Sequence, residues 1–97
     1  MIKKTLKEIS NNFLLLSESC ENDIIKASNA IIKALENNNK IMFCGNGGSA
    51  ADSQHLSAEL IGRYKKNRKP LSSISLTTDT SALTAISNDF SFNDIFS

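Results

Sequence analysis

Apolar residues recur at steps of three or four over residues 3–20, which is the spacing of one helical face. The residues on this face are Leu6, Ile9, Phe13, Leu16 and Cys20. Leu14 and Leu15 widen the face beyond what one neighbouring helix would cover. The pattern therefore predicts a helix that packs on more than one partner, including another subunit.

A second apolar pattern runs up to Leu35 and predicts another helix. Asn22 and Asp23, which lie just ahead of it, are residue types that cap helix N-termini. Three asparagines, residues 37–39, end the pattern in a turn. We therefore expect a helical segment over residues 1–39.

Beyond the asparagine turn, the pattern becomes that of strands joined by a helix. Lys40–Cys44 is a short apolar run typical of a buried parallel strand, and Ser72–Thr77 predicts a second strand. Between them lies a helical pattern over Ala50–Ile61. Ser49 is its expected N-cap, and Gly62 is the glycine expected after its C-terminus.

Short helices are expected near the end of the chain. Asp79 or Thr80 is placed to cap a helix over Ser81–Ile86. Asn88–Phe90 predicts a turn, and Asn93–Phe96 predicts the start of one more helix.

The order of these elements sets the fold class. A strand–helix–strand run predicts a right-handed parallel crossover, the front part of a doubly wound sheet. We therefore expect an α/β fold in one incomplete domain over residues 1–97. Residues 40–97 of that domain hold the first strand, a glycine loop, a helix and the second strand.

Composition limits the kinds of partner. The 97 residues carry a formal net charge of +1, which does not favour nucleic-acid binding. No apolar run approaches the roughly 18 residues of a membrane span, and no secretory signal pattern begins the chain. Cys20 and Cys44 are expected to be buried, unpaired thiols in a reducing cytoplasm.

A glycine loop, Gly45-Asn46-Gly47-Gly48-Ser49, joins the first predicted strand to the next helix. Glycine lets backbone approach a ligand closely, and free N–H groups at a helix start suit an anion or a sugar hydroxyl. The loop has neither the Walker A pattern nor the dinucleotide fingerprint. From the residues alone, a tight turn without a ligand remains the other interpretation.

His55 and Glu59 are four residues apart on the predicted helix, with Asp52 on the same face. Such a pair could give a divalent metal two ligands or place a carboxylate base beside an imidazole. It could equally be a solvated surface pair. The basic cluster Arg63–Lys69 is either a solvated loop or a contact to a phosphorylated substrate, with Arg63 the best candidate.

Two segments together resemble the phosphoheptose isomerases of the sugar isomerase (SIS) domain group. The first is C-G-N-G-G-S-A-A-D-S-Q-H-L-S-A-E-L-I-G-R-Y, Cys44–Tyr64, and the second is N-D-F-S-F-N-D-I-F-S, Asn88–Ser97. The resemblance implies an SIS-type sheet preceded by two helices. It also implies a cytoplasmic, zinc-dependent, tetrameric enzyme that interconverts sedoheptulose 7-phosphate and D-glycero-D-manno-heptose 7-phosphate. Its products would serve the heptose pathway for lipopolysaccharide or capsule.

The resemblance also assigns roles to individual residues. Glu59 matches the catalytic acid/base of the family and, together with His55, its zinc ligands. The residues that match its substrate contacts are Asn46, Gly47, Gly48, Glu59, Asn88, Asp89 and, less closely, Arg63. The serine/threonine phosphate loop and the remaining Gln and His ligands of the family have no counterpart here. We therefore expect the 97-residue chain to be inactive by itself.

Two other functions are compatible with the pattern. One is a non-catalytic SIS-domain regulatory protein that binds a replication initiator or a sugar phosphate. The other is a different sugar-phosphate isomerase or sensor built on the same sheet. The paired glycines together with His55 and Glu59 favour the heptose enzyme.

Overall fold

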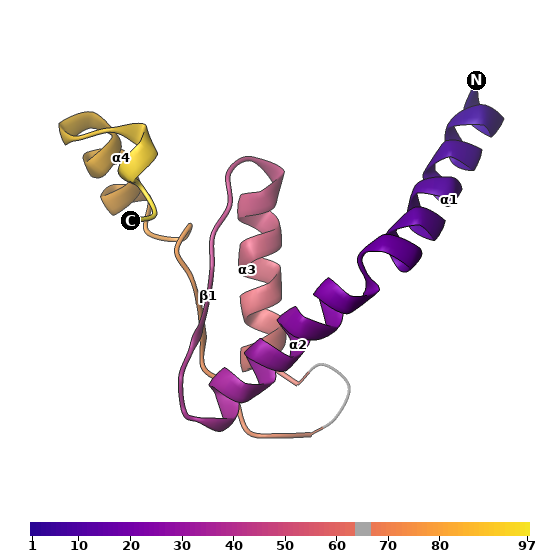
Figure 1. The fold of residues 1–97 in the computed structure, drawn as a ribbon. Helices are drawn as coiled ribbons and strands as arrows, with labels where there is room; N and C mark the ends of the chain where they lie inside the picture. Colours follow the sequence, from indigo (N-terminus) through magenta and orange to yellow (C-terminus); the bar gives the residue numbers. More distant parts are fainter. Residues whose placement is uncertain (64–66) are drawn as a thin grey trace. The chain divides into compact units, whose positions relative to one another are not determined.

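The computed structural model describes residues 1–63 and 67–97, which divide into two compact units, Met1–Lys33 and Ala34–Ser97. Helix α1 spans Ile2–Ser19 and helix α2 spans Glu21–Glu36 (Figure 1). Both helices that the apolar spacing predicts are therefore present.

The start of α2 differs from the sequence-based prediction of its N-cap. The N–H of Cys20 donates to the carbonyl of Leu16, and the Cys20 carbonyl accepts from the N–H of Ile24. Only Cys20 separates the helices, so Asn22 and Asp23 lie in the first turn of α2 and not ahead of it. The prediction that they form the N-cap is wrong.

The apolar face of α1 is open to solvent. No residue of α1 or α2 is buried, and Phe13 and Leu14 are 67% and 60% exposed. Contiguous exposed apolar faces often mark interaction surfaces, so this face of α1 is available to a partner. None of the helices in the described part of the chain is long and apolar enough to cross a membrane.

The second unit contains a parallel crossover. Strand β1 (Ile41–Phe43) pairs with strand β2 (Ser73–Ser75), and helix α3 (Gly48–Ile61) connects them and contacts both. Helix α4 (Thr80–Asp89) and a 3₁₀ turn, η1 (Phe92–Asp94), follow and contact each other (Figure 1). The strand–helix–strand order and its parallel pairing confirm the predicted fold class.

Within Ala34–Ser97, as far as the structure describes it, α3 covers one face of this sheet. Because neighbouring residues of a strand point to opposite faces, Met42 and Ile74 project from the face opposite α3. Their exposed fractions are 61% and 47%, and because Met42 is the middle residue of β1, the prediction of a buried first strand is wrong. Cys44 is also exposed and Cys20 is half-buried, although both are unpaired thiols as expected.

Several helix ends differ from the sequence-based assignment. Gly47 and not Ser49 is the N-cap of α3, and Gly62 ends it in extended backbone with φ −82°. Asn88 and Asp89 belong to the last turn of α4 and do not form a turn of their own. The Asp79 cap is confirmed, because its carboxylate accepts from the Ala82 N–H at 2.9 Å.

Small hydroxyl side chains join α3 to β2. Every buried residue among those described is a serine or threonine: Ser53, Ser57, Ser75 and Thr77. The Ser73 hydroxyl donates to the Ser57 carbonyl at 2.9 Å. The two hydroxyl oxygens lie 2.7 Å apart, so the remaining Ser57 proton points to Ser73. We call this pair the serine clasp; its short side chains let the helix and strand backbones approach closely.

Replacing Ser57 by alanine removes one hydrogen bond of the serine clasp. We expect the free energy of unfolding to fall by about 1 kcal/mol, the usual net value of such a bond. Urea unfolding of the 97-residue chain measures it. Ser49→Ala is the matched control, since Ser49 lies in the same helix with its side chain exposed. Equal effects of the two substitutions would contradict a stabilising clasp.

Candidate functional site

The glycine loop makes a tight connection from β1 to α3. Gly47 has φ +59°, in the region that favours glycine. At Gly45, an added Cβ would lie only 2.5 Å from the Ser49 carbonyl oxygen, so backbone passes backbone too closely for a side chain. In the first turn of α3, the N–H groups of Ser49 and Ala50 donate to the carbonyls of Asn46 and Gly47, each at 3.1 Å.

His55 and Glu59 lie side by side on α3. The His55 Nε2 atom is 3.2 Å from a Glu59 carboxylate oxygen. Ser53 and Ser57 face the sheet, and a shift of two residues turns a helix by roughly 200°. The His55–Glu59 pair therefore lies on the opposite side of α3, where the side chains are 75% and 35% exposed.

The donor set of this pair fits part of a zinc site. An imidazole nitrogen and a carboxylate oxygen are both ordinary zinc ligands, and zinc takes four. In the described residues, no three or more His, Cys, Asp or Glu side chains come together. The pair can thus supply two ligands, and a complete site needs donors from outside these residues.

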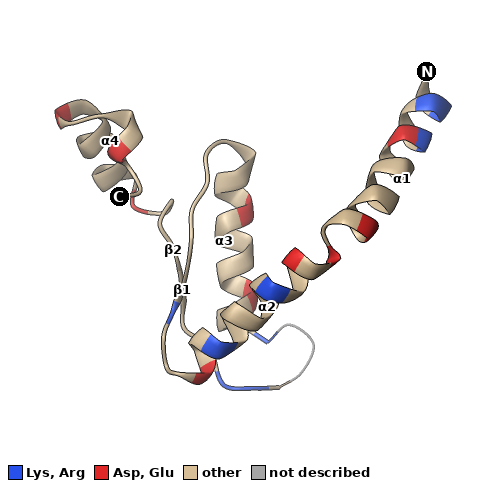
Figure 2. Ribbon diagram, in the orientation of Figure 1, with Lys and Arg blue, Asp and Glu red and all other residues tan. Residues whose placement is uncertain are grey.

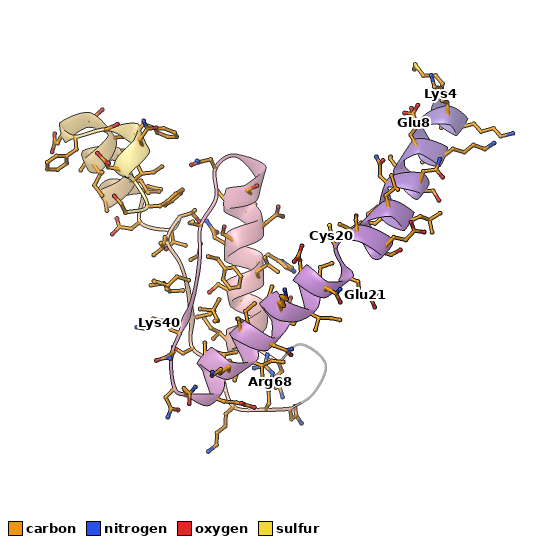
Figure 3. The ribbon with its side chains drawn as sticks, in the orientation of Figure 1. Lys4, Glu8, Cys20, Glu21, Lys40 and Arg68 are labelled. Carbon is orange, nitrogen blue, oxygen red and sulfur yellow. The ribbon has the colours of Figure 1, made fainter. Side chains whose placement is uncertain are left out.

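Figure 2 shows basic residues in the segment that follows α3, and Arg63 and Arg68 of that segment make different contacts. Arg63, the predicted phosphate contact, is exposed and donates to the Asn67 side-chain oxygen at 3.0 Å. Arg68 instead turns back to the helix end and donates to the carbonyls of Glu59 and Leu60, each at 2.8 Å (Figure 3). Residues 64–66 of the cluster lie outside the described residues.

Arg68 is a residue that the sequence analysis missed. The last four carbonyls of a helix lack partners within it, and a positive side chain there also complements the helix dipole. By bonding the Glu59 carbonyl, the Arg68 guanidinium holds the backbone of the candidate base in place. An arginine several residues after a helix end gives no periodic signal, so only the three-dimensional contact identifies it.

Asn88 and Asp89 stand apart from the other candidates. Both are exposed in the last turn of α4, and among the described elements α4 contacts only η1. No hydrogen bond or ion pair within residues 1–63 and 67–97 links them to the glycine loop or to α3. The glycine loop leads into the helix that carries the His55–Glu59 pair, with Glu59 eleven residues beyond Gly48, while the predicted contacts from α4 remain separate.

Comparison with known proteins decides the family. A model of the SIS domain matches residues 6–97. The chain belongs to the SIS domain family. This SIS chain is 53% identical over 95 residues to the phosphoheptose isomerase of Nitratiruptor, and 48% identical over 95 residues to that of Aquifex aeolicus. These matches cover 98% of the chain in both cases, but only 51% and 50% of those enzymes.

A solved structure has the same fold. The phosphoheptose isomerase of Neisseria gonorrhoeae superimposes with a TM-score of 0.85 at 38% identity, covering 98% of the SIS chain and 48% of that protein. The chain therefore spans about half the length of the relatives it matches. The glycine loop and the His55–Glu59 pair both lie in the shared half.

Gly47 and Gly48 offer a matched pair of substitutions. Gly47→Ala places a residue with a side chain at φ +59°, a backbone conformation that is strained for alanine. We therefore expect the free energy of unfolding to fall by about 1–3 kcal/mol. Gly48→Ala meets nothing within 4 Å and lies in a helix, where alanine is favoured, so stability should hold or rise. Urea unfolding of both variants checks this, and a Gly47→Ala variant as stable as Gly48→Ala would contradict it.

Proposed function

We propose that this chain supplies the glycine loop and the base of a phosphoheptose isomerase. The reaction interconverts sedoheptulose 7-phosphate and D-glycero-D-manno-heptose 7-phosphate. The observation that carries the proposal is the His55–Glu59 pair on α3, the helix that the glycine loop leads into, in a chain that matches about half the length of phosphoheptose isomerases.

Glu59 is the proposed acid/base. Aldose–ketose isomerisation needs a proton moved between adjacent carbons. The Glu59 carboxylate removes the proton beside the carbonyl, and the bonding electron pair forms the C=C bond of an enediolate. The remaining hydroxyl proton passes to the enediolate oxygen, and return of the abstracted proton to the neighbouring carbon then leaves the carbonyl at the other position. The side chain is only one-third exposed and its backbone is held by Arg68, which suits a base that must keep its place.

The glycine loop is proposed to bind the sugar. Asn46 is exposed at the loop, and its side-chain amide can both donate to and accept from hydroxyl groups. Gly47 and Gly48 leave the backbone bare there, since nothing lies within 4 Å of either Cβ position. Arg63 is the proposed phosphate contact, and Asn88 and Asp89 are proposed to reach the substrate in the complete enzyme.

Zinc is the proposed metal. His55 and Glu59 would hold it through an imidazole nitrogen and a carboxylate oxygen, and the other ligands would come from the half of the enzyme that this chain lacks. When bound, zinc would act as a Lewis acid that stabilises negative charge on the substrate oxygen. The proposal includes a tetrameric, cytoplasmic enzyme of the lipopolysaccharide or capsule pathway, and a 97-residue chain without activity of its own.

The role of Glu59 can be tested in a chimera of residues 1–97 and the second half of the Nitratiruptor enzyme. Glu59→Gln keeps the shape but removes the base, so kcat for sedoheptulose 7-phosphate should fall by about 10²-fold or more. Glu36→Gln, the same change at an exposed residue of α2, should leave kcat within about twofold. Turnover of Glu59→Gln within about tenfold of the parent chimera would exclude Glu59 as the base.

Zinc content tests the ligand pair independently of turnover. After dialysis, the chimera should retain about one zinc per chain, as one tetrahedral site requires. His55→Ala should lose most of it. Gln54→Ala, the exposed neighbouring residue on α3, should retain it. Equal zinc in the His55→Ala and Gln54→Ala proteins would remove His55 from the ligand set.

A further inference from the structure

The glycine loop is held on both sides by two adjacent residues that follow β2. Ahead of the loop, the Phe43 carbonyl at the end of β1 accepts from the Leu76 N–H at 2.8 Å. Behind the loop, the Ala50 carbonyl in the first turn of α3 accepts from the Thr77 hydroxyl at 3.4 Å. Because Leu76 and Thr77 are neighbours in the chain, the two bonds together hold the ends of the loop at a fixed separation.

The hydroxyls of Ser75 and Thr77 form a directional chain of hydrogen bonds. Their oxygens lie 2.7 Å apart, and the Thr77 N–H donates to the Ser75 oxygen at 3.4 Å. Both side chains are buried, so each hydroxyl proton needs an acceptor. If Ser75 donates to Thr77, the Thr77 proton reaches the Ala50 carbonyl and both protons are bonded. The opposite order leaves the Ser75 proton without an acceptor among the described residues, so Thr77 is the donor to Ala50.

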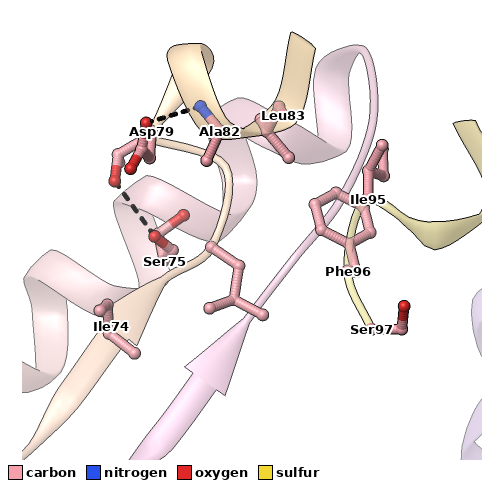
Figure 4. Close-up of a pocket in the computed structure, with 10 residues that line it drawn as sticks. Ile74, Ser75, Asp79, Ala82, Leu83, Ile95, Phe96 and Ser97 are labelled. Carbon is pink, nitrogen blue, oxygen red and sulfur yellow. Dashed lines mark hydrogen bonds between the residues drawn. The ribbon is translucent and has the colours of Figure 1, made fainter. Parts of the chain in front are cut away.

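The turn that carries Thr77 is itself held in place (Figure 4). The Thr78 hydroxyl donates to the Ser75 carbonyl at 3.2 Å, which closes the turn. The next residue, Asp79, caps α4 by accepting from the Ala82 N–H. A side chain can position another segment only if its own place is fixed by neighbouring contacts. The turn after β2 meets this condition, so it can act as the reference point for the glycine loop.

Ala50 links Thr77 to the most exposed part of the loop. The Ala50 carbonyl accepts from the Thr77 hydroxyl, while the Ala50 N–H donates to the Gly47 carbonyl at 3.1 Å. An added Cβ at Gly47 or Gly48 would meet nothing within 4 Å, so side-chain packing does little to hold this part of the loop. The position of the loop therefore depends on its hydrogen bonds, and the bond from Thr77 ties it to β2.

We propose that Thr77 is a positioning residue for the glycine loop, acting through Ala50 and without touching the substrate. This inference rests on the proposed function, in which the loop binds the sugar. A loop released from Thr77 has to be ordered again each time a substrate binds, which costs affinity. The bond to Ala50 is the same before and during the reaction, so its loss should weaken substrate binding and leave the chemical step unchanged.

Amide hydrogen exchange in the 97-residue chain tests the position of the loop without any assay of activity. Thr77→Val removes the hydroxyl and keeps the shape of the side chain, so exchange of the Ala50 N–H should speed up about fivefold. Exchange of the Gly62 N–H, at the other end of α3, should change less than about twofold. Thr5→Val is the matched control, because the Thr5 hydroxyl also donates to a helix carbonyl but lies exposed on α1. It should change neither amide.

The chimera with the Nitratiruptor second half tests the effect on binding. Thr77→Val should raise KM for sedoheptulose 7-phosphate about fivefold and leave kcat within about twofold. Thr77→Ser keeps a hydroxyl at this position, so KM should return to within about twofold of the parent chimera. Thr5→Val should change neither constant. A substitution that only lowered the stability of the fold would not separate KM from kcat in this way.

Several outcomes would overturn the role of Thr77. Unchanged exchange at Ala50 would show that the hydroxyl does not hold the loop. Equal acceleration at Ala50 and Gly62, or a Thr77→Val chain that does not fold, would mean that the hydroxyl stabilises the whole unit instead. A fall in kcat at constant KM, or a Thr77→Ser chimera no better than Thr77→Val, would also contradict it. A chimera without turnover would count against the proposed function, while exchange at Ala50 would still decide whether Thr77 holds the loop.

Discussion

The contact between α3 and β2 is the interaction on which the candidate site depends. The Ser57 and Ser73 hydroxyls, 2.7 Å apart, join helix to strand where most α/β units use large apolar side chains. Short side chains bring the helix close to the sheet, and their directional bonds fix its rotation. The rotation of α3 about its axis places His55 and Glu59 on the side of the helix that faces away from the sheet.

Two further features hold the ends of α3. At its start, Gly45 lets backbone pass the Ser49 carbonyl where any side chain would collide, and Gly47 turns the chain at φ +59°. At its end, Arg68 bonds the Glu59 and Leu60 carbonyls. The glycine loop thus leads into a helix that carries the candidate base and is held at both ends, an arrangement that suits a preorganised site.

Local patterns in the sequence predicted the elements, but not the contacts between them. Apolar spacing identified α1 and α2, the glycine loop located the start of α3, and Asp79 was recognised as a cap. The predicted α2 cap was wrong because Cys20 alone separates α1 from α2, which places Asn22 and Asp23 inside the helix, and the α3 cap was misplaced by two residues, from Gly47 to Ser49. The serine clasp and Arg68 could not be predicted, since serine gives no periodic signal and the Arg68 contact depends on how the loop folds back. The motif resemblance, and not the His55–Glu59 spacing alone, singled out this pair as the site.

We propose that the chain holds the base and the sugar-binding loop of an isomerase whose remaining groups lie in a second half. The most direct measurement is turnover of sedoheptulose 7-phosphate, assayed in parallel for the purified 97-residue chain and for the chimera with the Nitratiruptor second half. The account predicts turnover by the chimera and none by the chain alone. Turnover by the 97-residue chain at a comparable rate, or a folded chimera without turnover, would contradict it.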